Sequence, residues 1–129
     1  MTAEGTRRLC TAFLEAVERR DLDAIVAHFA PDASWRNVPH PPAVGQEAIR
    51  DLLGPILRRA SSVRWDVVAA SYEPERAWLE RVDRFWIDGQ EYAVACNGVF
   101  EVGEDCRFAE VRDYVDLGEW RTRLQDVRW

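Results

Sequence analysis

The chain has 129 residues, a formal net charge of −6 and a sequence pI near 4.9. This length suits one domain, residues 1–129, and an apolar content of 47% is that of a folded globular protein. The acidic charge without a basic stripe excludes nucleic acid as an expected partner, and no apolar run reaches the roughly 20 residues of a membrane-spanning helix.

The N-terminal segment is amphipathic and lacks the uninterrupted apolar stretch of a secretion signal, so a cytoplasmic protein is expected. The three cysteines share no metal-ligand spacing, and neither histidine has a partner at such spacing. No metal and no other cofactor is therefore predicted, and the cysteines are interpreted as reduced thiols of the core or the surface.

Helices and one short strand are predicted in the first part of the chain. Apolar residues at helical spacing predict a helix over Ala3–Arg20. A shorter helix follows at Leu22–Phe29, capped by Asp21 and ended by Pro31. A short strand is predicted over Ser34–Val38.

A proline-rich loop comes next, because Pro39, Pro41 and Pro42 lack the backbone donor that a strand ladder needs. A third helix is predicted over Gln46–Ala60, and Pro55 inside it is expected to kink or split it.

From residue 63 onward the apolar pattern changes to a period of two, which is typical of strands. Asp88-Gly89 is a strong signal for a hairpin turn between two of them, and residues 103–105 predict a second turn. The predicted strands are Val63–Ser71, Arg76–Ile87, Gln90–Val102 and Arg107–Asp116, followed by a short helix at Leu117–Val127. Helices separated from a run of antiparallel strands indicate an α+β fold, with a curved sheet wrapped by about three N-terminal helices into a cone around one pocket.

Charged side chains interrupt apolar strands at two places. Arg81 and Asp83 are two residues apart on a strand and share a face. Asp113 shares its parity with Ala109, Val111 and Val115, so it is predicted to be a buried carboxylate. If Arg81 lies between the two carboxylates, its fork of donors can bond both, and one proton on the pair gives an acid beside a base.

A structural interpretation stays open at this point, because Arg–Asp pairs on strands commonly form cross-strand salt links without chemistry. Asn37 could orient a water or a substrate hydroxyl, yet a residue before a proline-rich loop is more often part of a turn. Trp35 shares the strand parity of Asn37 and alone would be a core residue. His40 is interpreted as an exposed or pocket-rim residue, and Trp65 as part of the core or an interface.

Four strings in order resemble the limonene-1,2-epoxide hydrolase family, within the cone-shaped folds typified by nuclear transport factor 2. They are NVPHPPAVG at 37–45, ERVD at 80–83, GVFEV at 98–102 and RDYVDL at 112–117. Their order and spacing carry the resemblance, which covers nearly the whole chain.

The resemblance implies a homodimeric enzyme that opens a small apolar epoxide with water in one step, without metal or covalent intermediate. If the family's catalytic roles apply to the matching positions of this sequence, Asp113 is the base that deprotonates water and Asp83 is the acid that protonates the epoxide oxygen. Arg81 bridges the two carboxylates, and Asn37 holds the water.

Two positions depart from the family pattern. Trp35 replaces a tyrosine that helps to hold the water, and an indole N–H can donate a hydrogen bond but not accept one. Val111 replaces a tryptophan beside the base, so the pocket is expected to have a different shape. By the same correspondence Val94 and Cys96 are predicted to line the pocket.

Three other functions remain open. The first is a cyclase in which a substrate hydroxyl replaces water, which the loss of the tyrosine motivates. The second is a proton-shuttling isomerase or aldol cyclase of the ketosteroid isomerase or polyketide cyclase (SnoaL-like) type. The third is a non-enzymatic module for small-molecule binding or dimerisation.

Overall fold

The computed structural model describes all residues, 1–129. The helices are α1 (Ala3–Glu18), α2 (Leu22–Ala27), α3 (Gln46–Arg59) and α4 (Leu117–Leu124). The strands are β1 (Phe29–Val38), β2 (Ala43–Val44), β3 (Ser62–Glu73), β4 (Arg76–Ile87), β5 (Gln90–Val102) and β6 (Phe108–Val115). They form one curved sheet in the order β2-β1-β6-β5-β4-β3, antiparallel except for the parallel pair β1–β6.

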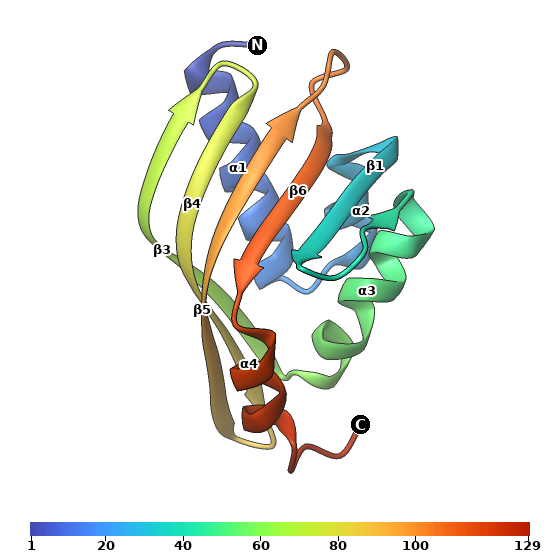
Figure 1. Ribbon diagram of the computed structural model, residues 1–129, viewed down its shortest axis with the longest axis vertical. Helices are drawn as coiled ribbons and strands as arrows, with labels where there is room; N and C mark the ends of the chain where they lie inside the picture. The colour runs from blue at the N-terminus through green and yellow to red at the C-terminus, as the bar shows by residue number, and fades with distance from the viewer.

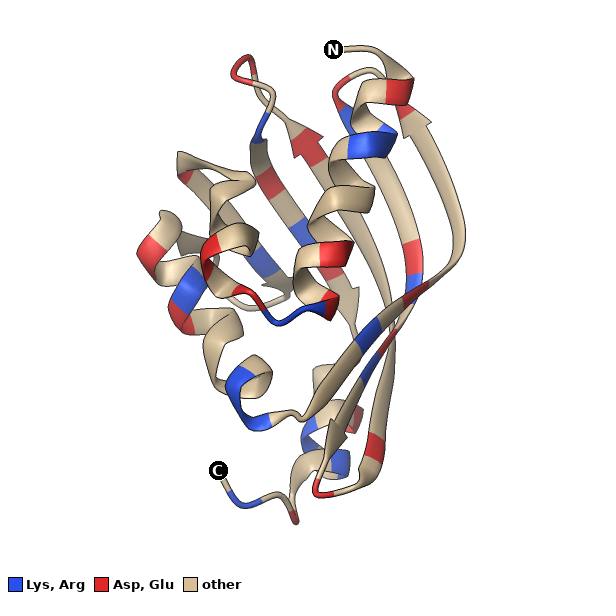
Figure 2. Cartoon of the chain, turned by 180° about the vertical axis from the view of Figure 1, so that it is seen from behind, with Lys and Arg blue, Asp and Glu red and all other residues tan.

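The predicted α+β cone is confirmed. The helices α1, α2 and α3 lie on one face of the curved sheet, and α4 lies at the end of β6 beside α3 (Figure 1). The core fills the space between helices and sheet, with Phe13 of α1 packed edge-on against Phe29 and Phe108. Basic and acidic residues are both scattered over the helices and the sheet (Figure 2). None of the helices combines the length and the apolar character required to cross a membrane.

The first helix forms as its pattern predicts, although it ends at Glu18 rather than at Arg20. The side chain of Thr2 caps it by accepting a hydrogen bond from the Gly5 amide at 2.9 Å. Its apolar face buries Cys10, Phe13, Ala16 and Val17 against the sheet.

The region around Pro31 differs from the prediction. The second helix ends at Ala27, and β1 begins at Phe29, five residues before the predicted strand start at Ser34. Pro31 is tolerated within β1 because the ladder with β6 is interrupted between Phe29 and Ser34. The predicted proline-rich loop also contains the two-residue strand β2, which pairs with β1.

Helix α3 is continuous across Pro55, so this proline does not split it. The four predicted strands after residue 62 are all present: β4 and β5 have the predicted bounds, and the ends of β3 and β6 differ from the prediction by one or two residues. At the predicted hairpin between β4 and β5, Asp88 and Gly89 both adopt positive φ, at 52° and 78°. This conformation matches the twist of the strands, and β4 and β5 consequently pair along their whole length from Ile87–Gln90 to Arg76–Glu101.

Candidate active site

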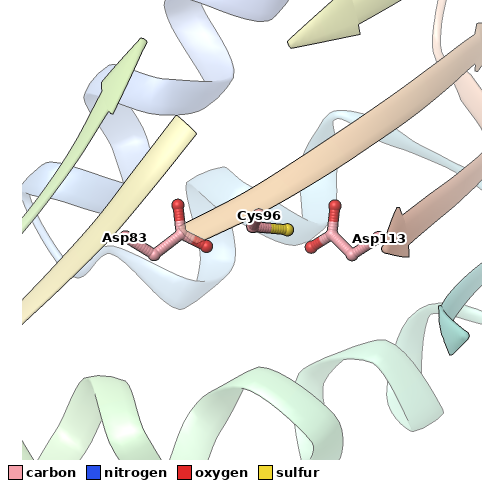
Figure 3. Close-up of side chains that lie close together, drawn as sticks. All are labelled: Asp83, Cys96 and Asp113. Atoms are coloured by element: carbon pink, nitrogen blue, oxygen red, sulfur yellow. The ribbon is translucent and has the colours of Figure 1, made fainter. Parts of the chain in front are cut away.

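Three neighbouring strands bring charged side chains to one place on the concave face of the sheet. Arg81 on β4 pairs with Cys96 on β5, whereas Asp113 on β6 pairs with Gly98 of β5. The carboxylates of Asp83 and Asp113 point from β4 and β6 towards the space in front of β5, with Cys96 between them (Figure 3).

Arg81 bonds both carboxylates, each through two nitrogens. Its Nε and Nη2 donate to the two oxygens of Asp83, both at 2.9 Å. Its Nη1 and Nη2 donate to Oδ1 and Oδ2 of Asp113 at 3.2 and 3.0 Å. The exposed fractions are 1% for Arg81, 6% for Asp83 and 4% for Asp113, so the three groups form one buried ionic cluster.

The cluster carries an excess of negative charge when both carboxylates are ionised, because one guanidinium faces two acids. Burial, with the nearby negative charge of Asp113, raises the pKa of Asp83 above its ordinary value despite the bonds from Arg81. Burial also disfavours the charged guanidinium, but the two carboxylates outweigh it and hold the pKa of Arg81 well above its usual value. The cluster therefore favours one proton on the carboxylate pair at a pH where free aspartates are ionised.

Neighbouring side chains hold the guanidinium from its other sides. Its central carbon lies 4.7 Å from the ring centre of Trp65 and 5.8 Å from that of Phe100, a cation–π arrangement. Its Nη2 also lies 3.3 Å from the sulfur of Cys96. Burial, together with the negative charge of Asp113, raises the pKa of this thiol, so Cys96 acts as a neutral packing group rather than a nucleophile.

Both carboxylates face a cavity of about 140 Å³, here called the inner cavity. Its wall is mainly apolar and combines side chains of α3, β4, β6 and α4, including Leu53, Ile56, Phe85, Val115, Leu117 and Trp120. The apolar wall with two carboxylates in it is typical of a small-molecule site with a few polar groups at fixed positions.

The structure places most of the predicted site residues around this cavity. Trp35, Asn37, Asp83, Val94, Cys96 and Asp113 all line it, and Arg81 lies beneath its floor, bonded to both acids. Val111 is fully buried in the hydrophobic core and does not belong to the cavity wall. The indole nitrogen of Trp35 is buried without a hydrogen-bond partner.

Several residues of the site were not predicted from the sequence. Trp65 packs against the core as the sequence predicts, and it also lines the cavity and covers Arg81, which the sequence does not predict. Gly98 is the second: a Cβ atom there would lie 2.5 Å from Nη1 of Arg81 and 2.7 Å from Oδ1 of Asp113. A glycine inside an apolar strand, such as Gly98 in β5, is a known sign of close approach by another group and could have indicated this role.

The ligand atoms of Asp83, Cys96 and Asp113 lie within 4.8 Å of one another, a spacing that a metal ion could use. All four carboxylate oxygens already accept hydrogen bonds from Arg81, however. The guanidinium thus supplies the positive charge at this point, and a divalent cation would have to displace or oppose it. The donor set fits an acid–base pair bridged by arginine better than a metal centre.

Solved structures with this fold support the architecture. A candidate polyketide cyclase from Xanthomonas campestris pv. campestris is 21% identical, with a TM-score of 0.79 over 94% of this chain and 97% of that one. Bal32a, from a soil-derived mobile gene cassette, is 20% identical, with a TM-score of 0.76 over 92% and 95%. A candidate SnoaL-like polyketide cyclase from Shewanella denitrificans OS-217 is 11% identical, with a TM-score of 0.79 over 93% and 96%.

At these identities the structures show a shared fold, the cone of nuclear transport factor 2-like and SnoaL-like proteins. The sequence itself carries a family signature over most of its length: residues 10–111 match the model of the SnoaL-like domain. The chain therefore belongs to the SnoaL-like domain family.

Proposed function

We propose that this protein is an epoxide hydrolase of the limonene-1,2-epoxide hydrolase type, which adds water to a small apolar epoxide in one step. One observation carries the proposal: a single buried arginine bonds two carboxylates that face the same apolar cavity. Opening an epoxide needs proton removal from water and proton delivery to the ring oxygen together, and a bridged acid–base pair supplies both.

In the proposed reaction Asp113 is the base and Asp83 the acid. Asp113 takes a proton from water while the water oxygen attacks one epoxide carbon. The carbon–oxygen bond of the ring breaks, and the epoxide oxygen receives the proton of Asp83, which gives a vicinal diol. Asp113 ends protonated and Asp83 ionised, so one proton passed back between them or through solvent restores the starting state.

The different surroundings of the two carboxylates support this assignment. Burial raises the pKa of Asp83, so Asp83 is suited to hold the proton that an acid must deliver. Asp113 lies between β5 and β1, where it pairs with Asn37 across the parallel ladder. The Asn37 side chain lines the same cavity and can hold a water beside Asp113 by donating or accepting a hydrogen bond.

A second candidate is an epoxide-opening cyclase, in which a hydroxyl of the substrate replaces water. Trp35 favours it, because this side chain offers no acceptor for a water hydrogen and its indole nitrogen is buried. An isomerase or aldol cyclase agrees with membership of the SnoaL-like family, but such a proton transfer does not require an arginine that bonds two carboxylates.

We also propose that the protein is a homodimer. The outer face of the sheet, opposite the cavity, exposes the aromatic side chains of Trp78 and Tyr114 at 37% and 49%. Exposed aromatic residues on the outer face of a sheet are characteristic of contacts between subunits. Light scattering during size-exclusion chromatography distinguishes a dimer near twice 14.9 kDa from a monomer.

The reaction is tested by incubating the protein with small cyclic and terpene epoxides in oxygen-18 water, with Asp113→Asn as the matched variant. We expect labelled diol from the wild type and none above background from Asp113→Asn. Epoxy alcohols are included in the same panel. If the epoxy alcohols gave an unlabelled cyclic ether and no substrate gave a labelled diol, the protein would be a cyclase and not a hydrolase.

A further inference from the structure

A second chamber adjoins the inner cavity. It has a volume of about 370 Å³ and is called here the outer chamber. The two spaces share the lining residues Trp35, Asn37, Leu52 and Leu117. The remaining wall of the outer chamber comes from the loop between β1 and β2, from β2 and from α4, namely His40, Pro41, Pro42, Ala43 and Arg121.

The inner cavity alone holds only a small part of a substrate. At about 140 Å³ it is close to the roughly 150 Å³ of an engineered apolar cavity that binds benzene. A six-membered ring with its epoxide therefore fills the space in front of Asp83 and Asp113. Any substituent on this ring must extend past Asn37 into the outer chamber.

The outer chamber has a positive charge at its exposed rim, the guanidinium of Arg121. Nη2 of Arg121 lies 2.9 Å from Nε2 of His40, and because arginine only donates hydrogen bonds, Nε2 is the acceptor in this contact. The backbone of His40 is itself held, since its amide donates to the Asn37 carbonyl at 2.7 Å and its carbonyl accepts from Arg36 Nε at 3.0 Å. The contact therefore joins α4 to the β1–β2 loop at the chamber wall.

Arg121 has donors to spare. A guanidinium offers five N–H donors, and the contact with His40 uses one of them. The acidic groups of α4 are engaged elsewhere, because Asp116 accepts from the Glu119 amide and the Glu119 carboxylate pairs with Arg123. Arg121 itself forms no ion pair. Basic positions on α4 are visible beside the end of the sheet in Figure 2.

We propose that the outer chamber binds a carboxylate on the substrate through Arg121, so that the preferred substrates are ring epoxides with a carboxylate-bearing tail. The inference rests on the proposed epoxide hydrolysis. A planar carboxylate matches the fork of the free guanidinium donors. In the inner cavity a carboxylate would lose its water against a mainly apolar wall, and Arg81 already bonds both acids there. This difference sets the orientation, in which the ring enters the inner cavity and the carboxylate tail stays in the outer chamber.

Binding is measured first, with 3-cyclohexylpropanoic acid and its methyl ester as unreactive probes at pH 7. Quenching of tryptophan fluorescence reports occupancy, because Trp35, Trp65 and Trp120 line the inner cavity. Arg121→Gln is the test variant. Arg58→Gln is the matched control, since it makes the same charge change at an exposed position of α3 outside both chambers.

We expect the wild type and Arg58→Gln to bind the acid about tenfold more tightly than the ester, the effect of one charge-assisted hydrogen bond at a partly exposed site. The preference should decrease with added salt and vanish in Arg121→Gln. Equal affinity of the wild type for acid and ester, or an equal loss of both in Arg121→Gln, would overturn the proposal.

Turnover of the epoxides of 3-(cyclohex-3-enyl)propanoic acid and of its methyl ester is measured next with the same variants. The acid should have the lower KM in the wild type, with a similar kcat for both, because the tail binds equally in ground state and transition state. Preferential binding of the acid probe without diol from either epoxide contradicts the hydrolase but supports the carboxylate site. Diol from both epoxides with no preference for the acid supports the hydrolase and contradicts the carboxylate site.

Discussion

Gly98 provides the space in which Arg81 crosses from β4 to Asp113 on β6. A Cβ atom at position 98 would lie 2.5 Å from Nη1 of Arg81, far closer than atoms of this kind approach each other. The guanidinium cannot move away cheaply, because it is fully buried and bonded to two carboxylates. The absence of a side chain at Gly98 is thus a condition for the bridged acid–base pair.

The first prediction follows from this fit. Gly98→Ala is expected to lower kcat about 100-fold, because a displacement of about 1 Å in a catalytic group has an effect of this size. Gly103→Ala is the control, since its new Cβ would meet Ala109 at 3.5 Å, an ordinary contact. Wild-type rates for Gly98→Ala would mean that the bridge between Arg81 and Asp113 is not needed for turnover.

The second prediction concerns the two acids. Asp113→Asn should reduce kcat by a factor of about 10²–10⁴, because an amide cannot accept the proton of water. Asp83→Asn should be nearly as severe, since it removes the proton donor for the leaving oxygen. Circular dichroism in the near ultraviolet checks that both variants keep the wild-type packing. If a folded Asp113→Asn variant kept a normal rate, Asp113 could not be the base.

The third prediction concerns stability. Arg81→Ala should lower the free energy of unfolding by about 3–5 kcal/mol, because it leaves two buried carboxylates without their counter-charge. Urea unfolding measures this loss. Arg84→Ala is the matched control on the same strand: Arg84 also bonds two acids, Asp66 and Glu91, but in contact with solvent. A much smaller loss is expected there, and equal losses would contradict a special role for burial.

The fourth prediction is a pH dependence with a defined sign. Burial raises the pKa of Asp83 above 3.8, so the folded protein holds this proton more tightly than the unfolded chain. Its contribution to stability is complete below the unfolded pKa and is lost as the pH rises through the folded pKa. The rate should fall over the same range, because Asp83 must be protonated to act as the acid.

Urea unfolding is measured from about pH 4 upward for the wild type and Asp83→Asn, and kcat/KM over the same range for the wild type. The variant cannot lose this proton, so its free energy of unfolding should not show the decline that Asp83 causes. A rate that rises with pH through this range in the wild type would assign the acid to another group.

The sequence predicted the β4–β5 hairpin and the shared burial of Arg81, Asp83 and Asp113, because two-residue periodicity decides which side chains share a face. It did not predict the parallel pair β1–β6. The prediction of buried positions was wrong where a bulge interrupts the two-residue period of the strand. Ala109 was grouped with Asp113 by parity, yet it is exposed and Phe108 is buried, because the register shifts where Val102 pairs with Phe108. A bulge of this kind depends on the partner strand, which local sequence does not contain.

Several residues of the cavity wall could not be predicted from the local sequence either. Leu117 and Trp120 line the inner cavity only because α4, which follows β6, lies beside the lower part of β5 (Figure 1). Trp65 covers Arg81 because β3 pairs with β4 in a register that places Trp65 opposite Asp83. Both contacts join residues that are far apart in the chain, and neither can be recognised from the periodicity of the local sequence.

The last prediction concerns Trp35, whose indole nitrogen is buried without an acceptor in the cavity wall. Trp35→Tyr replaces a group that can only donate by a hydroxyl that can also accept a hydrogen from water. We expect faster hydrolysis of small epoxides. Trp35→Phe is the control, because it removes similar volume without adding a hydroxyl. If both variants changed the rate equally, the effect would come from cavity size, and Trp35 would not limit the positioning of water.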